Sequence, residues 1–167
     1  VHRDIKPDNI MFDEHGASVI TDFGIAKAAS GQRLTGTGMS IGTPHYMSPE
    51  QARAQETDGR SDIYSLGVVA YQALLGQVPY DGEDSFSIGY KHIMEAIPEP
   101  VLNTADERRL YTVIRKMLAK DPVDRFQTGL DLVEEIEGRP AAPRRLSGAS
   151  TRERLAAMPT TPIPAVT

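Results

Sequence analysis

The chain has 167 residues, of which 40% are apolar, and a formal net charge of −5 from 18 Lys and Arg against 23 Asp and Glu. That length suits a single domain with enough apolar residues to form a core. Because the sequence contains no cysteine, it excludes a disulfide framework, a thiolate metal site and a thiol nucleophile. No stretch approaches the roughly 18 consecutive apolar residues of a membrane helix, and no signal peptide opens the chain, so we expect no membrane segment within these residues.

The charge divides the chain into two parts. Residues 1–138 carry 13 basic and 22 acidic side chains, whereas residues 139–167 carry five Arg and one Glu together with five of the 12 prolines. The first part, at −9, is predicted to be the folded domain. The second, at +4 and poor in large apolar residues, is predicted to be a disordered tail rich in Pro, Arg and Thr. An acidic body with so sparse a basic tail argues against nucleic acid as a partner.

The predicted elements begin with a β-hairpin, whose short apolar strands at 10–12 and 18–20 flank a turn-rich tetrapeptide. Residues 24–49 hold five of the 14 glycines and no periodic pattern, which predicts a long functional loop. Ser61 and Asp62 then open a helix over 63–75 that is apolar on nearly every face and is therefore buried. Further helices are predicted over 85–96, 106–119 and 128–137, the second with an apolar face of Leu110, Val113, Ile114, Met117 and Leu118. The fold class is mainly α with one short hairpin.

Four polar side chains near the start of the chain are candidates for chemistry. Asp4, Lys6 and Asn9 lie on one short loop, and Asp22 follows the hairpin at the point where it returns to that loop. Carboxylate and amide oxygens suit Mg²⁺, which binds few protein ligands and completes its shell with substrate phosphates. A nearby lysine would neutralise a phosphoryl group, and the remaining aspartate would accept a proton from an attacking hydroxyl. An isolated Asp or Asn in a loop more often serves as a turn or cap residue.

Three motifs in register resemble the protein kinases, whose signature runs H-R-D-L-x-x-x-N, D-F-G and A-P-E. The corresponding segments are His2-Arg3-Asp4-Ile5-Lys6-Pro7-Asp8-Asn9, Asp22-Phe23-Gly24 and Ser48-Pro49-Glu50. The resemblance covers about residues 1–138 and implies a protein-kinase-like fold. The segment 41–52 looks most like the bacterial serine/threonine branch. Protein substrates with Ser or Thr hydroxyls are then the expected partners, with self-association for autophosphorylation as a further expectation.

The resemblance assigns a role to each site residue. Asp4 looks like the catalytic base and Lys6 like the residue that steadies the γ-phosphate of ATP, while Asn9 and Asp22 look like ligands of Mg²⁺, with Mn²⁺ as an alternative cation. Thr43 would hydrogen-bond Asp4 and Lys6 beneath the substrate hydroxyl. This activity implies a cytoplasmic location, which also agrees with the absence of cysteine.

The resemblance also implies regulatory and structural residues. Arg3 would bind a phosphate on the loop between Gly24 and Gly42, where Thr35 and Thr37 are the preferred acceptors. Glu50 and Arg125 resemble a buried ion pair of the family, and Asp62 is expected to accept backbone N–H groups of the catalytic loop. His2 is read as a packing residue. Three further histidines are expected at surface or turn positions: His15, His45 and His92.

The Gly-rich loop, the strand lysine and the helix glutamate of kinases precede the catalytic loop and do not occur in these 167 residues. The hinge and the long helix beneath the catalytic loop precede it as well. We therefore expect a C-terminal lobe with the N-terminal lobe absent, a buried helix short of apolar partners, and little phosphoryl transfer by the 167 residues alone. A pseudokinase-like scaffold or regulator is the alternative. A small-molecule phosphotransferase of the aminoglycoside kind fits less well, because it lacks the Gly42-Thr43-Pro44 segment.

Overall fold

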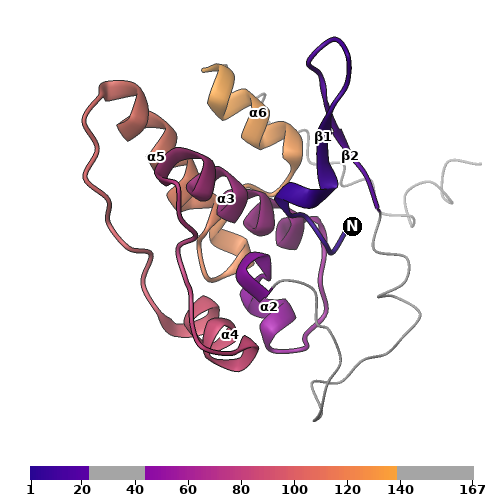
Figure 1. The fold of residues 1–167 in the computed structure, drawn as a ribbon, viewed down its shortest axis with the longest axis vertical. Helices are drawn as coiled ribbons and strands as arrows, with labels where there is room; N and C mark the ends of the chain where they lie inside the picture. The colour runs from indigo at the N-terminus through magenta and orange to yellow at the C-terminus, as the bar shows by residue number, and fades with distance from the viewer. Residues whose placement is uncertain (23–43, 139–167) are drawn as a thin grey trace, which may run out of the picture.

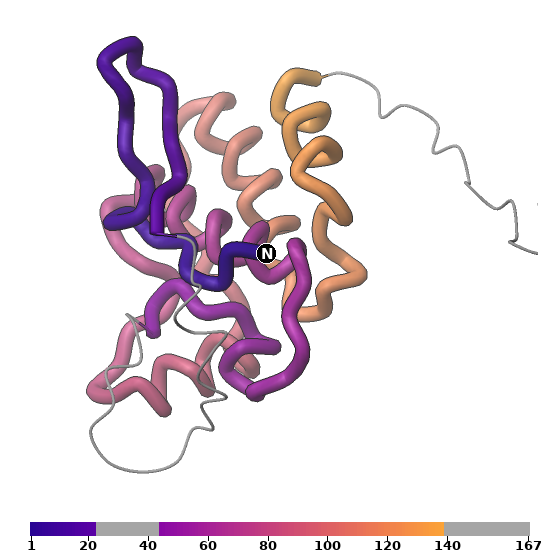
Figure 2. The backbone as a smooth tube through the Cα atoms, turned by 90° about the vertical axis from the view of Figure 1, so that its right-hand side faces the viewer, coloured from indigo at the N-terminus to yellow at the C-terminus, as the bar shows by residue number. Residues whose placement is uncertain are grey.

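The computed structural model describes residues 1–22 and 44–138. In these two ranges the chain is mainly helical with one two-stranded antiparallel sheet, which confirms the predicted fold class. Figure 1 shows the hairpin and α6 (Gly129–Glu137) at one end of the molecule and α4 (Ser85–Met94) at the other. The perpendicular view in Figure 2 shows the same separation. None of the helices in these ranges combines the length and apolar character needed to cross a membrane.

The hairpin forms as predicted. A short 3-10 helix, η1 (Pro7–Asn9), leads into β1 (Ile10–Phe12), which pairs with β2 (Ser18–Ile20) in a register that places Met11 opposite Val19. The Asp13 carboxylate accepts hydrogen bonds from two backbone amides of the turn, at 2.9 and 2.8 Å, and Gly16 adopts a φ of 77°. Such local hydrogen bonding and a left-handed glycine are typical of turns, so the sequence of this hairpin is sufficient to define it.

The centre of the body is α3 (Gly59–Leu75), which packs against α5 (Ala105–Met117). At Gly67 the two helices approach so closely that an added Cβ would lie 2.8 Å from the Cβ of Met117. Buried aromatic and aliphatic side chains fill this interface, among them Tyr64, Val68, Tyr71, Tyr111, Ile114 and Leu118. A second cluster extends it toward α6, formed by Ile63, Val113, Met117, Phe126 and Leu132.

Short helices complete the body, and their ends follow capping rules. Ser48, Asp84, Thr104 and Thr128 each form a reciprocal capping box with the residue three positions later, at the starts of α2 (Pro49–Ala52), α4, α5 and α6. Residues 44–138 also contain two 3-10 turns, η2 (Pro44–Tyr46) and η3 (Pro122–Asp124). The predicted helices over 85–96, 106–119 and 128–137 are thus present with slightly shorter bounds.

Three predictions about this region were wrong in detail. Asp58, not Ser61, accepts the backbone hydrogen bond that caps α3, so the helix begins at Gly59. The predicted loop over 24–49 contains η2 and the first residue of α2, while residues 24–43 lie outside the described part. Leu110, predicted to be on the apolar face of α5, is 40% exposed. In each case the deciding contact comes from another element, which a local pattern does not contain.

Candidate active site

The backbone of the loop before η1 is fixed by one carboxylate from α3. Asp62 lies in the first turn of that helix and accepts hydrogen bonds from the amides of His2, at 2.7 Å, and Arg3, at 2.8 Å. The structure therefore contains the contact that the sequence predicts for Asp62. Arg3 adopts a φ of 68°, a left-handed conformation that is uncommon for a residue other than glycine. The two hydrogen bonds to Asp62 hold this turn in place.

Asp4, Lys6 and Asn9 lie together on the following turn. The Asn9 amide nitrogen donates hydrogen bonds to the backbone oxygen of Asp4, at 2.8 Å, and to its carboxylate, at 3.3 Å. The Lys6 ammonium lies 3.6 Å from the same carboxylate, with both side chains about one-fifth exposed. One carboxylate is thus contacted by an amide donor and a cation and is still accessible to a substrate.

The hairpin brings Asp22 back to this loop. The Thr21 amide donates to the backbone oxygen of Asn9, at 2.9 Å, and the buried His2 ring contacts the Thr21 oxygen at 2.9 Å. His2 therefore has a packing and backbone-bonding role, as its sequence context indicates. Asp22 follows directly, with a φ of 55°. The contacts of Thr21 with Asn9 and His2, which are 12 and 19 positions away in sequence, therefore bring Asp22 back to the loop.

The donor set fits a magnesium ion bound with phosphates. Because the nitrogen of the Asn9 amide is hydrogen-bonded to Asp4, its oxygen is the end that would face a cation. Asp22, an exposed residue at the end of the hairpin, would supply a carboxylate oxygen. Hard oxygen donors in this small number match Mg²⁺, which retains water and phosphate oxygens in its shell. In residues 1–22 and 44–138, no three His, Cys, Asp or Glu side chains form a metal-binding group.

Gln51 is a positioning residue that the sequence analysis missed. Its side-chain amide donates to the backbone oxygen of Arg3 at 3.0 Å, and its side-chain oxygen accepts from the Ser48 amide at 2.9 Å. The short helix α2 therefore contacts the same loop as Asp62, at the oxygen of Arg3 and not at an amide. The spacing Ser-x-x-Gln at 48–51 is a capping-box pattern and could have predicted the helix, although not the contact with Arg3.

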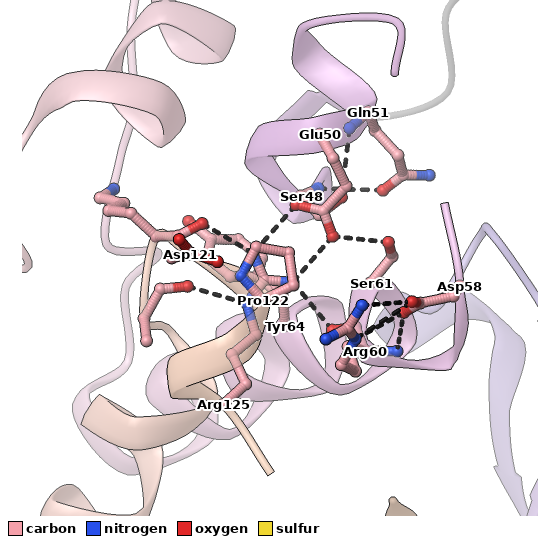
Figure 3. Close-up of polar contacts among 12 residues, drawn as sticks. Ser48, Glu50, Gln51, Asp58, Arg60, Ser61, Tyr64, Asp121, Pro122 and Arg125 are labelled. Atoms are coloured by element: carbon pink, nitrogen blue, oxygen red, sulfur yellow. Dashed lines mark hydrogen bonds and ion pairs between the residues drawn. The ribbon is translucent and has the colours of Figure 1, made fainter. Parts of the chain in front are cut away.

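A buried ion pair links α2 to the C-terminal part of the body (Figure 3). Arg125 binds Glu50 through two hydrogen bonds of 2.7 and 2.9 Å, and donates its other hydrogens to the backbone oxygens of Ala119, Arg60 and Lys120. All five guanidinium hydrogens are thereby satisfied. Burial acts to raise the pKa of Glu50, but the hydrogen bonds from Arg125 and Ser61 outweigh it, and the pKa lies below its usual value. The pair predicted at these two positions is therefore present and charged.

The prediction for His92 was wrong. Its ring is fully buried, and Nδ1 lies 2.9 Å from the hydroxyl oxygen of Tyr64. The rings of Tyr64 and Tyr80 each make an edge contact with the His92 ring. Burial, together with the charge of Lys120, lowers the pKa of His92 to about 4. His45 is half-buried and its ring lies 2.9 Å from the carboxylate of Asp81, whereas His15 is exposed on the hairpin turn as predicted. The sequence signal that could have revealed His92 is its spacing of four from Ile88 on one helix face.

Other predicted residues lie outside the described part of the chain. Thr43, predicted to lie beneath the substrate hydroxyl, belongs to this group, as do the regulatory candidates Thr35 and Thr37. The predicted tail over 139–167 also lies outside it. Of the predicted site residues, the described ranges contain Asp4, Lys6, Asn9 and Asp22, and the loop that carries the first three is hydrogen-bonded by Asp62 and Gln51.

A loop of this composition, held by a helix carboxylate and followed by a hairpin that returns an aspartate to it, characterises one class of phosphotransferase. The family model described as "Protein kinase domain" matches residues 1–135. The chain belongs to the protein kinase family.

Several curated bacterial proteins are similar to the chain. The serine/threonine-protein kinase PknB of Mycolicibacterium smegmatis is 42% identical over 167 residues, an alignment covering 95% of this chain and 27% of that protein. PrkC of Bacillus subtilis is 43% identical over 138 residues, covering 82% of this chain and 21% of PrkC. PknA of Corynebacterium glutamicum is 45% identical over 150 residues, covering 86% and 31%. The chain therefore spans between about a fifth and a third of the length of these relatives.

Proposed function

We propose that these residues form the C-terminal lobe of a bacterial serine/threonine protein kinase, which transfers the γ-phosphoryl group of ATP to Ser or Thr hydroxyls of proteins. The observation that carries the proposal is the convergence of Asp4, Lys6 and Asn9 on one turn, with Asp22 returned to it by the hairpin. The relatives named as serine/threonine-protein kinases support the same reaction. An intact set of polar side chains favours an enzyme over a scaffold that has lost its site.

Each residue has a distinct task in this proposal. The Asp4 carboxylate orients the substrate hydroxyl and accepts its proton. The Lys6 ammonium, 3.6 Å from that carboxylate, neutralises charge on the phosphoryl group. The Asn9 oxygen and the Asp22 carboxylate would hold Mg²⁺, which when bound neutralises the phosphates of ATP. Thr43 would close the site beneath the hydroxyl.

Control by phosphorylation is the second part of the proposal. The Arg3 backbone is fixed by Asp62 and Gln51, while its side chain is exposed. An exposed guanidinium on a fixed backbone suits binding of a phosphate on Thr35 or Thr37, because the charge of the phosphate would then be recognised at a defined position. Phosphorylation between two copies of the protein is the expected route to this state.

The 167 residues alone are expected to transfer phosphate poorly, because a Gly-rich phosphate loop and a strand lysine do not occur in their sequence. An apolar groove beneath the catalytic loop supports the expectation that a long helix packs there in the whole enzyme. The groove is lined mainly by apolar side chains of the loop, the hairpin, α3 and α6, including Ile5, Ile20, Ile63, Leu66 and Leu132.

The test is phosphoryl transfer by the complete open reading frame that contains these residues. Purified protein is incubated with labelled ATP, Mg²⁺ and a Ser/Thr-containing protein substrate, and wild type is compared with Asp4→Asn. We expect a loss of more than about 100-fold, the usual contribution of general acid–base catalysis. Glu14→Gln, an exposed carboxylate on the hairpin turn, is the matched control. Equal rates for wild type and Asp4→Asn would refute the proposal.

A further inference from the structure

Helix α4 exposes large apolar side chains on its outer face. Phe86, Tyr90 and Met94 are 80%, 54% and 62% exposed, and their spacing of four residues places them in one stripe. The opposite face of the same helix is buried through Ile88, Gly89 and His92. The helix thus packs with its smaller side chains inward and presents larger apolar ones to the surroundings. A contiguous exposed apolar surface of this kind is typical of an interaction site.

This α4 stripe, defined as Phe86, Tyr90 and Met94, is separate from the other exposed apolar residues. Many of those residues lie on the hairpin and on α6, at the opposite end of the molecule, among them Met11, Phe12, Leu130, Val133 and Ile136. The remaining ones are single exposed side chains at other places: Val1, Val101, Leu110 and Val123. The hairpin and α6 also line the groove beneath the catalytic loop, through Ile20 and Leu132. A helix packed in that groove would therefore leave the α4 stripe uncovered.

Exposed carboxylates border the α4 stripe. They lie before the helix at Asp81, Glu83 and Asp84, and after it at Glu95 and Glu99. The basic group on the helix, Lys91, donates a hydrogen bond to the backbone oxygen of Asp81 at 2.7 Å. An apolar stripe with an acidic border fits a segment that combines Arg or Lys with large apolar side chains, because charge complementarity then adds to apolar contact.

We propose that the C-terminal segment 152–158 of the same chain docks on the α4 stripe. This segment reads Arg-Glu-Arg-Leu-Ala-Ala-Met and places Arg152, Arg154, Leu155 and Met158 within seven positions. It belongs to the 139–167 region, whose net charge of +4 is opposite to the −9 of residues 1–138. The segment therefore has both of the features that the surface requires.

The length of the chain permits this contact. A folded body of this size has a radius of gyration of about 14 Å and a diameter of roughly 40 Å. The 13 residues between Gly138 and the segment extend by up to about 3.3–3.6 Å each, so they span roughly 45 Å. Because the segment is tethered to the body, its binding is intramolecular and does not depend on the protein concentration.

The test uses the 167-residue chain and one nitroxide label. Because the sequence has no cysteine, Ser150→Cys provides a single attachment point next to the docking segment. The label is expected to weaken the amide NMR signals of α4 more than those of α5 or α6 at low salt. The loss of signal should disappear at 1 M salt, where the screening length falls to about 3 Å. It should also disappear in R152E/R154E.

Matched surface variants locate the contact. F86S/Y90S/M94S is expected to restore the α4 signals, whereas L130S/V133S/I136S, which removes three exposed apolar side chains of α6, is expected to leave the loss unchanged. If the triple variant does not fold, Phe86→Ser alone serves, because that side chain is 80% exposed. Three results would overturn the proposal: unchanged α4 signals in the labelled chain, a loss centred on α6 or the hairpin, and a loss seen only when labelled and isotope-enriched chains are mixed. The last result would indicate a second copy as the occupant. None of these measurements depends on phosphoryl transfer.

Discussion

The catalytic-loop region, residues 1–22, and the helical body, residues 44–138, are stabilised in different ways. The body contains two apolar clusters and the buried pair of Glu50 and Arg125. In the catalytic-loop region the buried residues are His2, Ile5 and Asn9, and the hairpin exposes large apolar side chains on both strands. The geometry of the loop therefore depends on hydrogen bonds from the body, chiefly those of Asp62 and Gln51. The difference shows that a site with little core of its own can be held by two polar side chains of a well-packed neighbour.

The largest effect is expected from removing the buried cation of the body. Arg125→Ala leaves the Glu50 carboxylate buried without its partner, which costs about 3–5 kcal/mol of unfolding free energy. Urea denaturation followed by circular dichroism measures this cost. Arg115→Ala, on the exposed side of α5, should change the free energy by less than about 0.5 kcal/mol. Similar values for the two variants would contradict the view that the ion pair anchors the body.

Replacing Asp62 should destabilise the catalytic-loop region without destabilising the helical body. Asp62→Ala removes two hydrogen bonds to a charged acceptor, each worth about 1.5–3 kcal/mol, although part of this is recovered by solvent at the exposed Arg3 amide. Hydrogen exchange should accelerate in residues 2–9 and remain unchanged in α5. Asp106→Ala, an exposed carboxylate in the first turn of α5, is the control. Equal acceleration in α5 would mean that the two regions unfold together.

Low pH should reduce the unfolding free energy of the helical body, because His92 is buried in its neutral form. Its pKa is lowered from 6.5 to about 4 in the folded chain, so the unfolded chain binds the proton first as the pH falls. The stability is complete above about pH 6.5 and is lost toward pH 4, with a cost of about 2 kcal/mol at pH 5. Denaturation midpoints at pH 7 and pH 5 measure the effect. His92→Gln should flatten this dependence and His15→Gln should not; an unchanged slope in His92→Gln would disprove the assignment.

The smallest effect is expected at the second anchor of the loop. Gln51→Ala removes one side of the capping box of α2 and the hydrogen bond to the Arg3 oxygen, a loss of about 1 kcal/mol. Combined with Asp62→Ala, it should accelerate exchange in residues 2–9 beyond either single change, since both anchors act on Arg3. Gln55→Ala, at an exposed position just after α2, is the matched control. If exchange in the double variant were no faster than in Asp62→Ala, Asp62 alone would hold the loop.

Local patterns predicted the elements and the site loop well. The Asp13–Gly16 turn defines the hairpin through contacts within five residues, and the amphipathic pattern of α5 predicts a helix with bounds close to those observed. Contacts between distant positions were harder to predict. Gln51 reaches the Arg3 oxygen across 48 positions, and His92 is buried because Tyr64 and Tyr80 surround it. Neither contact leaves a periodic signal along the chain.

The sequence by itself determined the family-defining motifs, the helical character and the chemical identity of the four site residues, because these depend on residue type and short spacing. The tertiary structure decided where α3 begins, how the loop backbone is held, and which side chains are buried. Asp62 lies in the first turn of α3, and α3 is packed against α5 through the close contact at Gly67. The overall charge of −5 likewise does not reveal that acidic residues flank the α4 stripe. The stripe itself exists only because the helix places Phe86, Tyr90 and Met94 on one exposed face.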